Sequence, residues 1–390
     1  MRVLVAFDKF KDALSARETC EIAIEAIQKC RPEWEVETAP LADGGDGFCD
    51  TLTGCLNGEF HEATVSGPLV KKVNAQFGIV SVDRLQKSVI ELLNWNSDLE
   101  KIAVIELAES SGISLTPLEN RSPWTTTTAG LGEVIQSAIN YGANGAVVGL
   151  GGSATHDLAL GALWKLGFRF IDKNGVIIDR PPTPENWPTI NRIEARSTVL
   201  PKDFELRVAC DVENPLLGPM GAAAIFGPQK GLVPSRYDAL ESATSHMAKM
   251  LCDACSTPYA TMEQPGTGAA GGAAFGLKVG LGAQIVPGYE LVKNWIGLNA
   301  KFERADIVIT GEGRFDASSL QGKGPGALAL ESIANNKQLF VFAGSLGELE
   351  TSGFPTESTH AISPIGMPLA EALQSTGRNL QRAILSAFGN

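Results

Sequence analysis

The chain has 390 residues, of which 44% are apolar and 42 are glycines, and its formal net charge is −12. This length exceeds one ordinary hydrophobic core and predicts two domains, while the acidic balance argues against nucleic-acid and anionic membrane partners, which bind clustered Lys and Arg. Seven cysteines, no signal-peptide pattern and no apolar run of ~18 residues predict a cytoplasmic protein with free thiols and no membrane span.

The first residues predict a β-α-β unit. An apolar run at 1–8 has the length of a strand, and Ser15 and Glu18 have the spacing of a capping box that begins a helix. Pro32 ends this helix, and residues 34–41 read as the second strand.

Residues 59–124 have a different pattern, because strand-like runs follow one another with no room for crossover helices. These runs are 60–68, 72–82, 87–95 and 101–109. We expect them to pair largely antiparallel. Together with strand-like runs at 168–179 and 205–212, they predict a second, mixed α/β domain.

Apolar strands alternate with amphipathic helices again at 125–160 and at 292–390, which is typical of a parallel sheet covered on both faces. The predicted fold class is therefore α/β. A Rossmann-like parallel-sheet domain is expected from 1–58, 125–160 and 292–390, and a second, inserted mixed α/β domain from 59–124 and 161–291.

Polar, glycine-rich loops follow the predicted parallel strands, at the strand ends where open α/β sheets bind ligands. The loops are Asp8–Lys11, Asp43–Gly47, Gly149–Asp157 and Gly311–Asp316, with Gly322–Pro325 opening the next helix. Two further stretches, 211–231 and 265–276, have the same composition. Glycine-rich turns before a helix let backbone N–H groups approach a phosphate, as "GLGGSATHD" and "GTGAAGG" would do unless their glycines serve close packing.

The residues in these loops are those that phosphoryl transfer requires: cations for phosphoryl oxygens, carboxylates for Mg²⁺ and a group that orients the attacking hydroxyl. The candidate cations are Lys9, Lys11, Lys230, Arg314 and Lys323. The candidate carboxylates are Asp8, Asp43, Asp46, Asp157, Asp211, Glu312 and Asp316.

Two alternatives remain open at this point. "GLGGSA" matches the dinucleotide-binding pattern, with Asp172 at about the expected ~20 residues downstream, which favours an NAD(P)-dependent oxidoreductase acting on a small hydroxy acid. That function leaves the aspartates at 43, 46, 211 and 316 unexplained. A binding protein without catalytic activity is the second alternative.

The loops, in this order, resemble those of the bacterial glycerate kinase family. The matching stretches are "AFDKFKDALSA", "PLADGGDG", "GLGGSATHD", "DVENPLLG", "IFGPQKG", "GTGAAGG" and "VITGEGRFDASSLQGKGP". The resemblance implies ATP and Mg²⁺ as cofactors, D-glycerate as the substrate, 2-phosphoglycerate as the product, and an active site in the cleft between two α/β domains. It leaves homodimerisation open.

The sequence departs from the family pattern at several positions. Lys9 replaces a Ser, Asp12 and Ala13 replace Gly-Ser, His156 replaces an Asn, and Leu158 and Ala159 replace Gly-Gly.

The resemblance and the loop chemistry together assign roles. We expect Lys11 or Arg314 to hold the glycerate carboxylate, and Asp8 or Asp43 to orient the attacking hydroxyl. Further substrate-binding residues are Lys9, Ser15, Gly44, Gly45, Asp157, Asp316 and Lys323. The expected ATP-binding residues are Gly151, Gly152, Ser153, Thr155, Gly266, Gly268, Gly271 and Glu312. The expected Mg²⁺ ligands are Asp46, Asp211 and Asp316.

Overall fold

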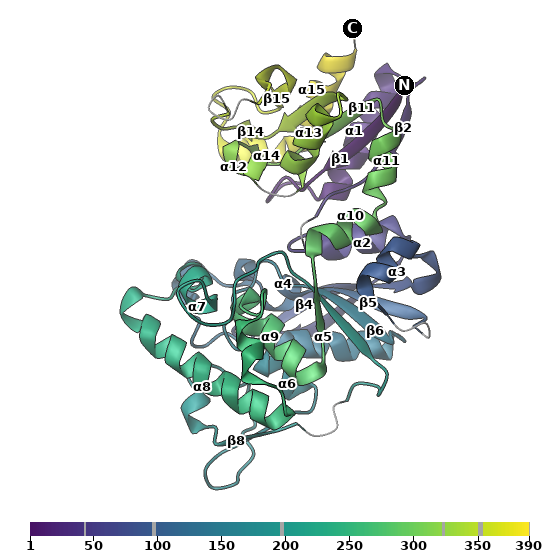
Figure 1. Cartoon of the computed structure of the whole chain (residues 1–390). Helices are drawn as coiled ribbons and strands as arrows, with labels where there is room; N and C mark the ends of the chain where they lie inside the picture. The colour runs from purple at the N-terminus through teal and green to yellow at the C-terminus, as the bar shows by residue number, and fades with distance from the viewer. Residues whose placement is uncertain (43, 96–98, 196–198, 322–323, 350–353, 390) are drawn as a thin grey trace. The chain divides into compact units, whose positions relative to one another are not determined.

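A computed structural model describes residues 1–42, 44–95, 99–195, 199–321, 324–349 and 354–389 (Figure 1). The chain divides into two compact units. The first comprises Met1–Asp43, Asp50–Leu52 and Val292–Asn390, and the second comprises Gly44–Cys49 and Thr53–Leu291. The first unit is thus assembled from both ends of the chain, and nearly all of the second is one continuous segment.

The first unit contains a five-stranded sheet in which all neighbouring strands are parallel. In spatial order the strands are β15 (Thr359–Ala361), β13 (Gln338–Ala343), β11 (Ile307–Gly311), β1 (Arg2–Phe7) and β2 (Glu35–Thr38). Counted along this unit, the order is 2-1-3-4-5, that of one common doubly wound α/β fold, and it reverses between β1 and β11. The predicted parallel-sheet domain is confirmed, and its ligand-binding position is expected at the carboxyl ends of these two strands.

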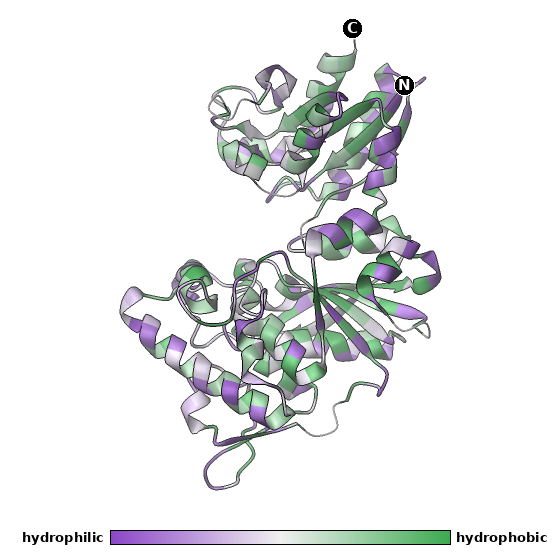
Figure 2. Cartoon of the chain, viewed as in Figure 1, coloured by the Kyte–Doolittle hydropathy of each residue, from purple (hydrophilic) through white to green (hydrophobic). Residues whose placement is uncertain are grey.

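Helices cover both faces of this sheet. They are α1 (Ala16–Cys30), α11 (Leu298–Arg304), α12 (Ala317–Gln321), α13 (Pro325–Ala334), α14 (Leu369–Gln374) and α15 (Thr376–Phe388). Helices α1 and α15 pack together on the face that carries Val3, Val5 and Phe7, and α13 contacts β11 and β13. Figure 2 shows the apolar strands between helices of mixed character. Two short strands, β12 (Arg314–Phe315) and β14 (Ser345–Leu346), form a separate parallel pair.

The predicted capping box at the start of α1 is confirmed. The Ser15 hydroxyl accepts a hydrogen bond from the Glu18 backbone N–H at 3.2 Å, and the Glu18 carboxylate accepts one from the Ser15 N–H at 2.9 Å. Both orphan amides at the helix start are therefore satisfied.

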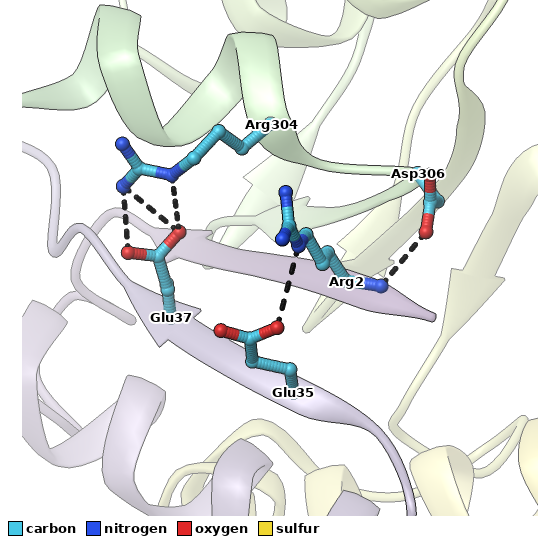
Figure 3. Close-up of polar contacts among 5 residues, drawn as sticks. All are labelled: Arg2, Glu35, Glu37, Arg304 and Asp306. Atoms are coloured by element: carbon cyan, nitrogen blue, oxygen red, sulfur yellow. Dashed lines mark hydrogen bonds and ion pairs between the residues drawn. The ribbon is translucent and has the colours of Figure 1, made fainter.

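Charged pairs join the amino ends of the central strands (Figure 3). The Arg304 guanidinium binds the Glu37 carboxylate at 2.8 Å, Arg2 Nε binds Glu35 at 3.3 Å, and the Arg2 backbone N–H donates to the Asp306 carboxylate. Because these side chains are exposed, solvent screens their charges and each pair adds little to stability. They lie at the opposite end of the strands from the expected ligand site.

The second unit contains a six-stranded mixed sheet. In spatial order its strands are β10 (Gln284–Val286), β9 (Glu205–Ala209), β6 (Gly145–Gly149), β5 (Lys101–Glu106), β4 (Lys72–Ser81) and β3 (Glu59–Ser66). The first four strands are parallel, and β4 is antiparallel to β5 and β3. The predicted mixed sheet is confirmed. In the turn between β3 and β4, Val70 is 56% exposed and has a left-handed φ of 65°.

The expected strand at 87–95 is wrong, because residues Lys87–Leu93 form helix α3. Val89 and Leu93 are its buried residues, four positions apart, which is the spacing of one helix face. A short apolar run with this composition fits the residue period of a strand as well as that of a helix.

Two layers of helices pack around the second sheet. The helices are α2 (Phe48–Cys55), α4 (Leu107–Ser111), α5 (Ala129–Asn140), α6 (Leu160–Lys165), α7 (Ala222–Phe226), α8 (Tyr237–Cys255), α9 (Ala269–Leu281) and α10 (Gly288–Trp295). Residues of α5 and α9 join the core over one sheet face. Helices α6 and α8 form a second core with the hairpin of β7 (Arg169–Ile171) and β8 (Arg192–Glu194). Helices α2 and α10 contain residues of both units.

The predicted assignment of 125–160 to the first domain differs from the structure. Strand β6 lies in the second sheet, paired with β5 on one side and β9 on the other. Its five residues are all buried, so its apolar composition fits the centre of either sheet. Among the described residues, no helix is long and apolar enough to cross a membrane.

Candidate active site

A pocket lies at the carboxyl ends of β1 and β11 in the first unit, where the strand order reverses. Its volume is about 660 Å³, and its polar lining includes Asp8, Lys9, Lys11, Glu312 and Arg314. The Asp8 backbone N–H donates to the carbonyl of Gly311 at 3.0 Å, which joins the two strand ends. Two loops that lie 300 residues apart in sequence therefore supply one pocket, as predicted for these five residues.

Charges of both signs meet in this pocket. Lys9 Nζ lies 3.6 Å from Asp8 Oδ1, and the Lys9 backbone N–H donates to the same oxygen at 2.7 Å. Burial raises the pKa of Glu312, and the negative charge of Asp8 raises it further, whereas the Ser319 hydroxyl and Lys9 lower it. A bound cation, or protonation of one of these carboxylates, would reduce the electrostatic repulsion between them.

The loop after β1 places Lys11 at an exposed position beside the pocket. The Phe10 N–H donates to the Leu14 carbonyl at 2.9 Å, and the Leu14 N–H returns a bond to the Phe10 carbonyl, which closes a tight turn. Asp12, inside this turn, has a left-handed φ of 62°. The turn fixes the backbone of Lys11, and its long side chain remains solvated.

Two residues predicted to bind substrate cap helices instead. The Asp316 carboxylate accepts hydrogen bonds from the Ser318 hydroxyl and N–H at the start of α12 and from Arg314 Nε at 2.9 Å, and these contacts lower its pKa to about 2. Ser15 caps α1 in the same way. Both side chains already have hydrogen-bond partners within the protein, and these contacts compete with the predicted role in substrate binding.

The glycine-rich turn at 44–47 belongs to the second unit and lies across the carboxyl ends of its sheet. A Cβ atom on Gly151 would lie 2.3 Å from the Gly45 Cα, and a Cβ on Gly44 would lie 3.6 Å from the Ala209 carbonyl oxygen. The Gly47 N–H donates to Glu106 Oε2 at 3.1 Å. The structure groups these loops at the second sheet, and their predicted meeting with the loop after β1 stays a prediction.

Glu106, the last residue of β5, is a functional candidate that sequence reasoning missed. It is 4% exposed, and its Oε2 accepts from the N–H groups of Gly47 and Cys49, at the start of α2. Burial raises its pKa to about 8, and the carboxylates of Glu109 and Asp46 add to the increase. Its position at a parallel strand end was the signal that could have identified it.

Lys230 also has a larger role than the sequence indicates. It is 1% exposed, and its Nζ donates to Ser153 Oγ at 2.9 Å and to the Thr155 carbonyl at 2.7 Å. Gly152, which lies in sequence between β6 and Ser153, has a left-handed φ of 70° that favours glycine. The loop predicted to bind phosphate is thus held by a buried ammonium group.

Asp157, predicted to bind substrate, is fully buried. Its Oδ2 accepts hydrogen bonds from the Thr128 N–H at 2.7 Å, the Thr128 hydroxyl at 2.9 Å and the Gly161 N–H at 3.3 Å. Burial raises its pKa to about 6. These contacts tie the start of α5 to the start of α6 and describe an internal anchor.

The glycines of 266–272 approach other backbone segments closely. A Cβ on Gly268 would lie 2.2 Å from the Pro215 carbonyl oxygen, and one on Gly271 would lie 2.1 Å from that of Thr155. Gly266 has a φ of 83°. These contacts favour the packing role for the stretch and place it directly against the Gly151–Thr155 loop.

The carboxylates predicted to bind Mg²⁺ belong to both units, Asp316 to the first and Asp46 and Asp211 to the second. Asp46 is exposed in the turn at 44–47, and Asp211, which follows β9, accepts from the Tyr289 N–H at 2.8 Å. Within the described ranges, no three His, Cys, Asp or Glu side chains form a group that could hold a metal ion. Carboxylate oxygens suit Mg²⁺, which takes one or two of them and completes its shell with water and phosphate. Asp43 and Lys323, also predicted as site residues, lie outside the described residues.

Comparison with known proteins identifies the family. A model of the glycerate kinase family matches residues 3–388. The chain belongs to the glycerate kinase family. It is 33% identical to a glycerate kinase of Bacillus subtilis strain 168 over 98% of this chain and 95% of that protein. It is 37% identical to a glycerate 2-kinase of Escherichia coli K12, over 89% of this chain and 86% of that protein.

A solved structure agrees with this assignment. The crystal structure of a glycerate kinase 2 from Salmonella typhimurium LT2 matches with a TM-score of 0.76 at 30% identity, and the match covers 99% of this chain and 97% of that one. The kinase class and the two-part α/β fold are therefore established for this chain.

The oxidoreductase alternative is wrong, and the structure gives the reason. After β6, the chain runs through residues 150–159 before α6 begins at Leu160, whereas a dinucleotide-binding turn leads directly into its helix. Asp172 accepts hydrogen bonds from the N–H groups of Asn174 and Val176 in an exposed turn after β7. It does not follow a parallel strand.

Three of the departures from the glycerate kinase pattern fall at left-handed positions. Asp12, Leu158 and Ala159 have φ values of 62°, 55° and 54°. The family pattern has glycine at each, which adopts this conformation without strain. His156, in place of Asn, is buried with Nε2 2.9 Å from the Thr244 hydroxyl, and burial lowers its pKa to about 3.

Proposed function

We propose that this kinase transfers the γ-phosphoryl group of ATP to the C2 hydroxyl of D-glycerate and forms 2-phosphoglycerate. The observation that carries this proposal is the pocket at the carboxyl ends of β1 and β11, in which Lys11 and Arg314 lie beside Asp8 and Glu312. A small anionic acceptor needs cations for its carboxylate and a carboxylate for its reacting hydroxyl. The relationship to the glycerate 2-kinase of Escherichia coli supports the position of transfer.

In this proposal the first unit binds the acid. Lys11 and Arg314, whose side chains are exposed at the pocket, hold the glycerate carboxylate. Asp8 orients the attacking hydroxyl, and Lys9, whose Nζ lies 3.6 Å from Asp8 Oδ1, holds that carboxylate in position. Asp43 remains a second candidate for the same role.

The second unit binds the triphosphate in this proposal. The Gly151–Thr155 loop, with the left-handed Gly152, presents its remaining backbone N–H groups to phosphate oxygens, since those of Gly151 and Ala154 donate to the carbonyls of Gly44 and Ser111. Asp46 and Asp211 supply the oxygen ligands of Mg²⁺, which neutralises charge on the transferred group. Asp316 is a weaker candidate because Arg314 and Ser318 already occupy its carboxylate.

The test is a product analysis. The protein is mixed with ATP, Mg²⁺ and D-glycerate, and the phosphorus NMR spectrum is followed; the expected products are ADP and 2-phosphoglycerate. Omitting Mg²⁺ or supplying L-glycerate should abolish the signal. Formation of 3-phosphoglycerate would overturn the position of transfer, and ATP hydrolysis without a phosphorylated acid would overturn the substrate.

A further inference from the structure

Within the described part of the chain, no carboxylate accepts a hydrogen bond from the buried side chain of Lys230. The side chain is 1% exposed, and its two hydrogen bonds go to neutral oxygens, the Ser153 hydroxyl and the Thr155 carbonyl. Asp157 is close enough to raise the pKa of Lys230, but it accepts its hydrogen bonds from Thr127, Thr128 and Gly161 instead. The ammonium group therefore donates only to neutral oxygens, and the charge of Asp157 acts on it without a hydrogen bond.

Such an arrangement is costly in the free protein. Moving an ammonium group out of water is unfavourable by several kcal/mol unless a counter-charge compensates. Burial accordingly lowers the pKa of Lys230 to about 7. A purely structural tether between Gly227–Gly231 and the Gly151–Thr155 loop requires no charge, because a neutral donor would satisfy the same two oxygens.

The position of the charge indicates what compensates it. Lys230 lies beneath the loop that leaves the carboxyl end of β6, where parallel sheets bind ligands. The same loop contains three buried polar atoms without a hydrogen-bond partner, Thr155 Oγ1, His156 Nδ1 and Asp157 Oδ1. The first two are neutral groups at a strand end, beside a cation that no carboxylate hydrogen-bonds, and they fit an anion that arrives from solvent.

Ser153 connects the buried charge to the surface of this loop. It is 8% exposed, more than Lys230 at 1% or the fully buried Thr155 and His156. Because Lys230 donates to Ser153 Oγ, the hydroxyl proton remains available to donate outward. A donor hydroxyl polarised by an ammonium group suits a phosphate oxygen.

We propose that Lys230 supplies the counter-charge for a polyphosphate bound on the Gly151–Thr155 loop, acting through the Ser153 hydroxyl. The ligand class is an inorganic or nucleoside polyphosphate, and the assignment to ATP rests on the proposed function above. Lys230 is a positioning residue in this scheme, because Ser153 and the loop N–H groups make the direct contacts.

The experiment measures the affinity of inorganic tripolyphosphate by isothermal titration calorimetry. The variants are Lys230→Met, which keeps the length and removes the charge, Ser153→Ala, and Lys249→Met on the exposed face of α8 as the control with the same change of net charge. We expect Lys230→Met to weaken binding about 10- to 100-fold and Ser153→Ala about tenfold, as for the loss of a charge-assisted hydrogen bond. The control should bind within twofold of wild type.

The outcomes separate a binding role from a structural one. If Lys230→Met lowers only the melting temperature and binds tripolyphosphate as wild type does, Lys230 is a tether and the proposal is overturned. If that variant does not fold, Ser153→Ala decides, and unchanged affinity in it overturns the proposal. Tripolyphosphate binding that depends on both residues, in a protein that fails to phosphorylate D-glycerate, would uphold this site and reject the proposed function.

Discussion

Replacing Glu106 by Gln should remove a pH-dependent loss of stability. The Glu106 carboxyl is 4% exposed, and burial raises its pKa from an ordinary value of 4.5 to about 8. The folded protein therefore binds this proton more tightly than the unfolded chain does. The resulting stabilisation is complete below pH 4.5 and is lost as the pH rises through about 8. Gln has no proton to lose, and its amide oxygen can accept the same bonds from Gly47 and Cys49.

The magnitude follows from the separation of the two pKa values. Linkage gives about 1.4 kcal/mol for each pH unit between 4.5 and about 8, or about 5 kcal/mol in total. Between pH 6 and pH 9, the wild-type protein should lose about 3 kcal/mol of unfolding free energy relative to Glu106→Gln. This difference is a large fraction of the stability of an ordinary domain.

Urea unfolding of both proteins at one-unit intervals from pH 5 to pH 9 measures this difference. The exposed Glu119→Gln is the matched control, and its unfolding curves should stay parallel to those of the wild type. Parallel pH profiles for wild type and Glu106→Gln would refute the reasoning, because they would mean that Glu106 ionises alike in the folded and unfolded states.

Three further predictions concern single side chains. Lys11→Met should lower kcat for D-glycerate phosphorylation about 100-fold or more with an unchanged melting temperature, because it removes a cation from the pocket. Ser15→Ala should cost about 1 kcal/mol of stability and leave KM for D-glycerate unchanged, because the hydroxyl caps α1. Val70→Asn should raise stability by about 1 kcal/mol, because a β-branched residue is strained at φ 65° and Asn tolerates this conformation.

Steady-state kinetics and thermal unfolding check all three. Wild-type turnover in Lys11→Met would remove Lys11 from the site, and a raised KM in Ser15→Ala would return Ser15 to the substrate ligands. For Val70, the control is Val176→Asn, a valine of similar exposure at 60% without a left-handed φ. Equal effects at both valines would contradict a strain at residue 70.

Local patterns predicted the elements well where one physical signal dominated. The capping box fixed the start of α1, and continuous apolar runs identified the parallel strands β1, β6 and β11. The strand prediction for 87–95 failed because the seven residues of α3, with two buried positions, fit both a strand and a helix. Length alone does not separate these two periods in so short a segment.

The sequence could not specify which distant segments pair in one sheet or lie together at one site. β6 has the composition of a central strand, and only its pairing with β5 and β9 places it in the second sheet. The rule that ligands bind at strand ends identified Asp8 and Glu312 correctly as neighbours, but it could not say which sheet each loop serves. Glu106 escaped notice, and Lys230 was a candidate cation whose burial was not predicted, because burial of a charged side chain depends on packing that a local sequence does not encode.

The construction of the first sheet from both ends of the chain has a consequence for biosynthesis. β1 and β2 leave the ribosome early, but β11, which pairs with the other edge of β1, is translated about 270 residues later. At about 5–20 residues per second, this delay lasts roughly 15–50 s. During that time the apolar edge of β1 has no permanent neighbour, while the continuous segment 53–291 is already complete. Nascent chains should therefore acquire a protease-resistant internal core before their amino-terminal strand becomes protected.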